Sequence, residues 1–206
     1  MKALAIIVVG CAAILVATIT ASRHRNRSTQ PVVDSVFEAV MPPSEHTASP
    51  DSIGDVEARD IEALKRQLVI PVQGVTRSQL RDTYSEARGN RTHEALDIPA
   101  PRGTPVISAM DGKLMRLFNS RTGGLMVYAA DPTDRFILLY GHLDRYADGV
   151  RDGMPLKRGQ VIGYVGTTGN APIGTPHLHF GILRGHPSTN WSRGVALNPF
   201  PLLASP

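Results

Sequence analysis

The chain has a single cysteine, Cys11, among its 206 residues, and it lies in an apolar stretch at the N-terminus. A disulfide within the chain is therefore impossible, and a metal site in the folded part must use histidine and carboxylate ligands. Aromatic residues make up only 5% of the chain, and its net charge of +4 is not gathered into a basic stripe. This composition gives no support to a nucleic-acid partner, and we expect none.

Charged residues are also missing from Ala3 to Ala21, a run of 19 residues. A helix of that length spans about 28 Å, close to the thickness of a bilayer core. We therefore expect residues 1–22 to be a membrane anchor or a signal peptide. Either would bring the rest of the chain into the cell envelope, outside the cytoplasmic membrane.

Three interpretations of this segment compete. An uncleaved anchor fits its length best, whereas residues 19–21 form an acceptable cleavage site for a signal peptide. The stretch "VVGC" faintly resembles a lipidation site at Cys11, but the apolar run continues well past it. The positive-inside rule opposes export, because Lys2 is outweighed by three arginines that follow the segment: Arg23, Arg25 and Arg27.

Residues 23–54 are rich in Ser, Thr and Pro and have no sustained period, which is typical of a flexible linker. Residues 55–70 differ, because their apolar positions recur near helical spacing, with acidic residues early and Lys65 and Arg66 late. This pattern predicts one amphipathic helix, ended by Pro71.

The remaining sequence, residues 71–206, is punctuated by many of the 19 glycines and 16 prolines of the chain. Short apolar runs lie between these turn residues, and no helical pattern of useful length intervenes. We predict a mainly β domain of antiparallel sheets, in which short strands are joined by hairpins. The expected strands cover residues 113–118, 125–130, 135–143, 160–166 and 177–183.

The last of these strands contains "TPHLHFGI", with two histidines one residue apart. Side chains alternate between the faces of a strand, so His177 and His179 should point the same way. The opposite face should carry the apolar residues Leu178, Phe180 and Ile182 into the core.

Four histidines lie in or beside expected strands: His93, His142, His177 and His179. A single histidine there is more often a hydrogen-bonded structural residue than a ligand. Four of them, with Asp97 four residues after His93, favour a metal site. By strand parity Tyr140 shares a face with His142, although we expect it to be a packed residue.

The stretch "HEALD" must bend, because in an extended strand His93 and Asp97 would lie roughly 13 Å apart. A helix would also bring them together, and Glu94 would then resemble the catalytic base of the zincin pattern. Prolines and a glycine follow at once, however, and position 97 is not a histidine. We therefore predict a bend that leads into a strand at Leu96, with Glu94 at the surface.

Four segments together resemble the lysostaphin-like (LytM-type) zinc metallopeptidases of bacterial cell-wall turnover. They follow that family's order and spacing from about Pro71 to Leu183, more than half of the chain. The resemblance implies the LytM-type peptidase fold for residues 71–206. The segments are "RTHEALDIPAPRGTPVISAMDGKL", "LYGHLDRY", "GMPLKRGQVIGYVGTTGNA" and "PHLHFGIL".

The resemblance also implies a role for each polar residue. His93, Asp97 and His179 match the ligands of one zinc ion per chain. His142 and His177 match two catalytic histidines that do not bind the metal. One of these would take a proton from water and pass it to the leaving amine, while the other donates to the developing oxyanion. The resemblance leaves open which does which.

Two features depart from the family pattern. Ala95 stands where many members have glycine, which would strain the backbone if that position required positive φ. An upstream tyrosine that some members use has no clear counterpart, and Tyr84 and Arg88 are candidates without a register. The loop "TTGNAPIGTP" is expected to form a cleft wall.

The resemblance implies a zinc endopeptidase that hydrolyses peptide cross-links of peptidoglycan. Its partners would be peptidoglycan stem peptides and, if the N-terminal segment is not cleaved, the membrane. One alternative is an inactive LytM-type module that binds the cell wall or activates an amidase. Another is a metallopeptidase that acts on a protein substrate. The sequence leaves open the cross-link, the oligomeric state and autoinhibition by residues 28–70.

Overall fold

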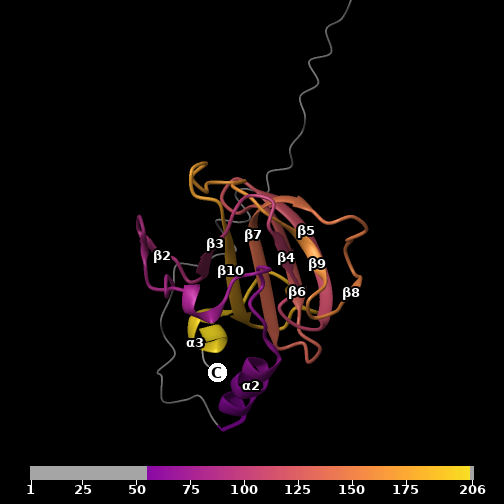
Figure 1. Ribbon diagram of the computed structural model, residues 1–206. Coiled ribbons are helices and arrows are strands. Elements are labelled where there is room, and N and C mark those ends of the chain that lie inside the picture. The colour runs from indigo at the N-terminus through magenta and orange to yellow at the C-terminus, as the bar shows by residue number, and fades with distance from the viewer. Residues whose placement is uncertain (1–54, 205–206) are drawn as a thin grey trace, which may run out of the picture. The chain divides into compact units, whose positions relative to one another are not determined.

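The structure is a computed structural model in which residues 55–204 are described (Figure 1). The predicted anchor over residues 1–22 and the predicted linker over residues 23–54 lie outside this range. Within the described residues, no helix is both long enough and apolar enough to cross a membrane.

The predicted amphipathic helix is present as α2 (Asp55–Gln67), and it ends three residues before the predicted limit at 70. Leu64 of this helix is 2% exposed and belongs to the main hydrophobic core. Asp60 forms an ion pair with Arg135, which lies at the start of a central strand. Asp60 also lies 3.9 Å from Arg184 Nη2, and Ile61 packs against the same core, so both apolar and charged contacts attach the helix to the sheet.

A nine-stranded sheet forms the body of the domain, and every pairing in it is antiparallel. Its main path runs β11-β10-β7-β6-β5-β8, while β3 pairs with β10 and β9 pairs with both β7 and β4. The mainly β prediction is confirmed. The strands are β3 (Leu96–Pro99), β4 (Pro105–Ile107), β5 (Gly112–Ser120), β6 (Gly124–Ala130), β7 (Phe136–Tyr146), β8 (Pro155–Leu156), β9 (Val161–Val165), β10 (His177–Arg184) and β11 (Val195–Leu197).

Five of these strands match the predicted ones, with ends that differ by at most three residues. The sequence reasoning missed the smaller elements, which have too few residues to show a period. These are the hairpin of β1 (Ala87–Arg88) and β2 (Arg91–Thr92), the 3-10 turn η2 (Arg77–Gln79), the short strands β4, β8 and β11, and helix α3 (Pro199–Ala204), which contacts α2 at one end of the sheet (Figure 1). Strand β3 begins at Leu96, as predicted.

Strand β10 has the two faces that its alternation predicts. Leu178, Phe180 and Ile182 are fully buried in the main core. The opposite face carries the two histidines at one end and, further along, Leu183 in a second apolar cluster. This second cluster also contains Met126, Tyr128, Ile137 and Leu139, with Phe118, Trp191 and Ala196 packed against it. The sheet face that carries this second cluster is thus apolar, except at the end of β10 where His177 and His179 lie.

Candidate metal centre

Three of the predicted site residues meet at the edge of the sheet where β3 and β10 pair. Asp97 of β3 lies directly opposite His179 of β10 in the antiparallel register. Asp97 Oδ1 is 3.2 Å from His179 Nδ1 and 3.0 Å from His93 Nε2. His93 Nε2 and His179 Nδ1 are themselves 3.0 Å apart. The structure therefore brings His93, Asp97 and His179 into one cluster of possible metal ligands.

The bend predicted in "HEALD" is present. Glu94 adopts a φ of 56° and turns the chain between His93 and strand β3. Ala95 is 1% exposed and is not among the residues with positive φ, so the residue that replaces the family's glycine is unstrained. Glu94 itself is half-buried, and its backbone N–H donates to the Tyr84 carbonyl at 2.9 Å.

Thr83 holds both residues of this bend. Its carbonyl oxygen accepts a hydrogen bond from His93 Nδ1 at 2.9 Å, and its hydroxyl accepts one from the backbone N–H of Asp97, also at 2.9 Å. Because Nδ1 of His93 donates its proton outward, Nε2 presents a lone pair to the cluster. No sequence motif pointed to Thr83, since its carbonyl acts through the backbone.

The donor set fits a zinc ion. A tetrahedral zinc with bonds of about 2.0–2.2 Å places its ligand atoms about 3.3 Å apart, close to the separations of 3.0, 3.0 and 3.2 Å found here. Two of the three atoms, His93 Nε2 and Asp97 Oδ1, are acceptors without a proton of their own. Two such atoms 3.0 Å apart repel one another unless a cation or a proton lies between them.

Protonation also suits metal binding. Burial disfavours the charged form of Asp97, but the neighbouring imidazoles of His179 and His93 outweigh it and hold the pKa of that carboxyl well below its usual range. Burial lowers the pKa of His179, partly offset by Asp97. The cluster therefore contains a carboxylate and a neutral imidazole at neutral pH, which are the forms that bind zinc.

His142 and His177 lie beside the cluster with similar anchoring. His142 Nδ1 donates to the Thr168 carbonyl at 2.8 Å, and His177 Nδ1 donates to the Thr175 carbonyl at 2.7 Å. Their ring centroids are 5.0 Å apart, and His177 Nε2 is 3.7 Å from Asp97 Oδ1. Among the described residues, Nε2 of each imidazole therefore has no backbone hydrogen-bond partner, and it lies on the side of the ring that faces the site.

The backbone of His142 departs from strand geometry, with a φ of 58°. Its N–H donates to the Gly123 carbonyl at 2.8 Å, where the pairing of β6 and β7 shifts register. The parity argument that placed Tyr140 on the face of His142 was therefore wrong. The expectation of a packed Tyr140 is confirmed, because this side chain is fully buried and its hydroxyl accepts a hydrogen bond from Ala109 N.

Close backbone contacts hold the two loops around His142. A Cβ added at Gly124, whose φ is 63°, would lie 2.2 Å from Thr168 Oγ1. One added at Gly169 would lie 2.3 Å from the Thr122 carbonyl oxygen. Only glycine fits at either position, and the loops can therefore pack closely enough for the Thr168 carbonyl to reach the His142 ring.

The sequence from residue 91 to residue 199 matches the family described as peptidase family M23, and this match covers more than half of the chain. The chain belongs to peptidase family M23. It is 36% identical over 131 residues to the L-Ala--D-Glu endopeptidase of Bacillus subtilis, covering 60% of this chain and 39% of that protein. It is 36% identical over 93 residues to the peptidoglycan DD-endopeptidase ShyC of Vibrio cholerae, covering 45% of this chain and 20% of that one.

Solved structures of M23 proteins share the fold. The catalytic domain of lysostaphin from Staphylococcus simulans superposes with a TM-score of 0.51 at 30% identity, covering 60% of this chain and 88% of that domain. A putative glycyl-glycine endopeptidase LytM from Ruminococcus gnavus gives a TM-score of 0.58 at 27% identity, covering 73% of this chain and 64% of that one. The chain spans well under half the length of the curated relatives described above.

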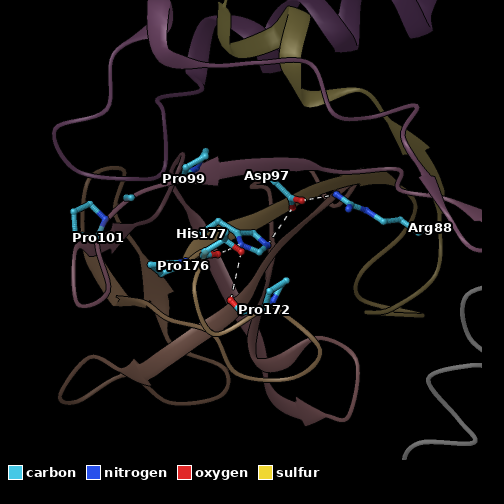
Figure 2. Close-up of a pocket in the computed structure, with 9 residues that line it drawn as sticks. Arg88, Asp97, Pro99, Pro101, Pro172, Pro176 and His177 are labelled. Atoms are coloured by element: carbon cyan, nitrogen blue, oxygen red, sulfur yellow. Dashed lines mark hydrogen bonds and ion pairs between the residues drawn. The ribbon is translucent and has the colours of Figure 1, made fainter.

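A groove of about 600 Å³ lies beside the metal-ligand cluster, and Asp97 of that cluster is among its lining residues (Figure 2). The predicted cleft-wall loop contributes Pro172 and Thr175 to its lining, and β3 contributes Asp97 and Pro99. The two upstream candidates differ in their position. Tyr84 donates its hydroxyl hydrogen to the Ala196 carbonyl, whereas Arg88 lines the groove and donates to Asp97 Oδ2 at 2.7 Å. The sequence feature that could have located Arg88 is the Gly89-Asn90 pair, a dipeptide typical of a hairpin turn, between the two short strands.

Proposed function

We propose that this M23 chain is a zinc-dependent endopeptidase that hydrolyses peptide cross-links of bacterial peptidoglycan. His93, Asp97 and His179 would hold one zinc ion, and His142 and His177 would carry protons beside it. The observation that carries the proposal is the convergence of three ligand atoms within 3.2 Å of one another, next to two imidazoles whose Nδ1 atoms are bound to backbone carbonyls. The names of the relatives, a DD-endopeptidase and an L-Ala--D-Glu endopeptidase, support peptidoglycan as the substrate.

Zinc, when bound, supplies Lewis-acid polarisation of a carbonyl and makes water more acidic at neutral pH. The chain's own residues supply proton transfer and orientation. Burial, with the nearby His179, lowers the pKa of His142 to about 4, so this imidazole is neutral at pH 7. A neutral imidazole with a free Nε2 suits the acceptor of the water proton. His177 is then assigned the donor role toward the developing oxyanion, which requires a proton on both ring nitrogens, because Nδ1–H already donates to the Thr175 carbonyl.

The Thr168 and Thr175 carbonyls orient these two rings before substrate binds. A hydrogen bond to Nδ1 selects the tautomer and restricts ring rotation, so that Nε2 stays directed to the reacting groups. The proline-lined groove beside Asp97 supplies the binding site for an extended peptide.

The inactive-module alternative is disfavoured by the donor set. A module that only binds the wall has no need for three ligand atoms and two oriented imidazoles, and this chain retains all five residues. We also propose that the domain acts in the cell envelope outside the cytoplasmic membrane, where cross-linked peptidoglycan lies, and that residues 1–22 direct it there.

The test is digestion of purified peptidoglycan by the purified chain, with and without a chelator, followed by mass analysis of the released fragments. We expect peptide fragments with new amine termini, no release in chelator, and recovery when zinc is restored. His179→Ala is the matched inactive control. A zinc-loaded chain that binds peptidoglycan but releases nothing would instead support the inactive-module alternative.

A further inference from the structure

The groove beside the metal cluster has an unusual lining. Four of its nine lining residues are prolines: Pro99, Pro101, Pro172 and Pro176. Proline has no backbone N–H and its φ is restricted, so these walls are preformed and offer no backbone donors at four positions. Arg88 is the only arginine or lysine in the lining (Figure 2). Recognition of a charged group in this groove therefore depends on Arg88.

The guanidinium of Arg88 is only partly occupied. Its Nη2 atom makes both contacts, at 2.7 Å from Asp97 Oδ2 and 3.0 Å from Glu86 Oε2. Within residues 55–204, both ion pairs of Arg88 are closest at Nη2, and no hydrogen bond from Nε or Nη1 is found. Arginine has five N–H donors, of which Nη2 carries two, so three remain for a ligand.

The competing partner, Glu86, holds Arg88 weakly. The side chains of Arg88 and Glu86 are 46% and 50% exposed, and ion pairs between exposed groups contribute little free energy. Asp97 is the stronger partner, with a side chain only 18% exposed. Asp97 also contacts the metal cluster through Oδ1, so its negative charge is shared between Arg88 and that cluster. Arg88 therefore keeps positive charge that a third group, a carboxylate of a ligand, can neutralise.

We propose that Arg88 binds a free carboxylate of the substrate peptide, on the residue adjacent to the scissile bond. The inference rests on the proposed function and specifies its substrate class: a peptide with a carboxylate next to the cleaved bond and small apolar groups against the prolines. The carboxylate must be close to that bond, because Arg88 contacts a residue of the metal cluster directly. A bond between guanidinium and carboxylate is charge-assisted and orients the peptide as well as binding it.

The test uses the full chain and two synthetic peptides that contain the L-Ala–D-Glu bond named for the Bacillus subtilis relative and differ only at the D-Glu residue. One carries the free carboxylate, and the other carries a carboxamide at the same position. Binding is measured by calorimetry in chelator, where hydrolysis is blocked, and again with zinc. We expect the carboxylate peptide to bind about 10-fold more tightly to the unmodified chain.

Arg88→Gln should remove this preference, so that both peptides bind equally. Arg91→Gln is the matched control, because Arg91 lies opposite Arg88 in the β1–β2 hairpin, is exposed and does not line the groove. This control should keep the 10-fold preference. Zinc content of each variant separates loss of recognition from loss of metal.

Two outcomes would overturn the inference. The first is an unmodified chain that shows no preference between the peptides, and the second is an Arg88→Gln variant that keeps the preference while cleaving both peptides equally more slowly. The second result would mean that Arg88 only positions Asp97. A chain that prefers the carboxylate through Arg88 but cuts neither peptide nor peptidoglycan would refute the proposed function and leave this inference standing.

Discussion

The imidazole of His142 is held by the backbone of Thr168, whose carbonyl oxygen accepts a hydrogen bond from Nδ1 at 2.8 Å. The hydroxyl of Thr168 fixes that carbonyl in turn. It donates to the Leu143 carbonyl at 2.7 Å and accepts from the Leu125 N–H at 3.0 Å. One threonine therefore ties the loop after β9 to β6 and β7 and, through its carbonyl, orients a candidate catalytic ring.

Thr168→Val tests this arrangement. The change keeps the side-chain shape but leaves the Leu125 N–H and the Leu143 carbonyl without their partner, which costs about 1–3 kcal/mol of unfolding free energy. We expect turnover to fall by roughly 10-fold, since small displacements of a catalytic group slow reactions strongly. Urea unfolding, zinc content and hydrolysis rates measure the three effects separately.

Thr168→Ser is the matched control, because serine keeps the hydroxyl and its two hydrogen bonds. It should restore most of the turnover and most of the stability. Equal turnover in the valine and serine variants would show that the hydroxyl does not position His142.

His179→Ala should abolish zinc binding, which is expected at about one ion per chain in the unmodified protein. The reason is that a catalytic zinc site uses three protein ligands, and two are too few to hold the ion firmly. Metal analysis after dialysis measures the effect. His186→Ala serves as control, since this exposed histidine contacts the Asp134 carbonyl rather than the cluster. Full zinc retention by His179→Ala would remove His179 from the site.

His142→Asn and His177→Ala should each keep most of the zinc and lower turnover by roughly 10² or more, the scale for loss of a general acid–base group. Asparagine is chosen at position 142 because it tolerates the φ of 58° found there, where alanine would add backbone strain. Zinc content and hydrolysis are measured together. If either variant lost its metal, that histidine would have to be counted among the ligands.

A reporter enzyme that is active only outside the cytoplasm, fused after Pro206, should be active. The uncharged run from Ala3 to Ala21 is long enough to direct export, although the arginines at 23, 25 and 27 act against it. Protease accessibility of the intact domain in spheroplasts is the second measurement. An inactive reporter on a protected domain would contradict both the location and the peptidoglycan substrate.

The sequence by itself determined the features that depend on neighbouring residues. The alternation from His177 to Ile182 was enough to assign the two faces of β10, because side chains on a strand point to opposite sides in turn. The central strands were found for a similar reason, since their apolar runs are bounded by turn residues. The need for a bend between His93 and Asp97 also followed, from the length of an extended chain.

The tertiary structure alone decided how distant segments meet. Asp97 reaches His179, 82 residues away, only because β3 and β10 pair in one register. His142 left the parity of β7 because the Gly123 carbonyl holds its backbone and the Thr168 carbonyl holds its ring. Arg88 reached Asp97 through a hairpin too short to show a period. Local patterns carry no information about such pairings, because register and loop packing depend on contacts between residues far apart in the chain.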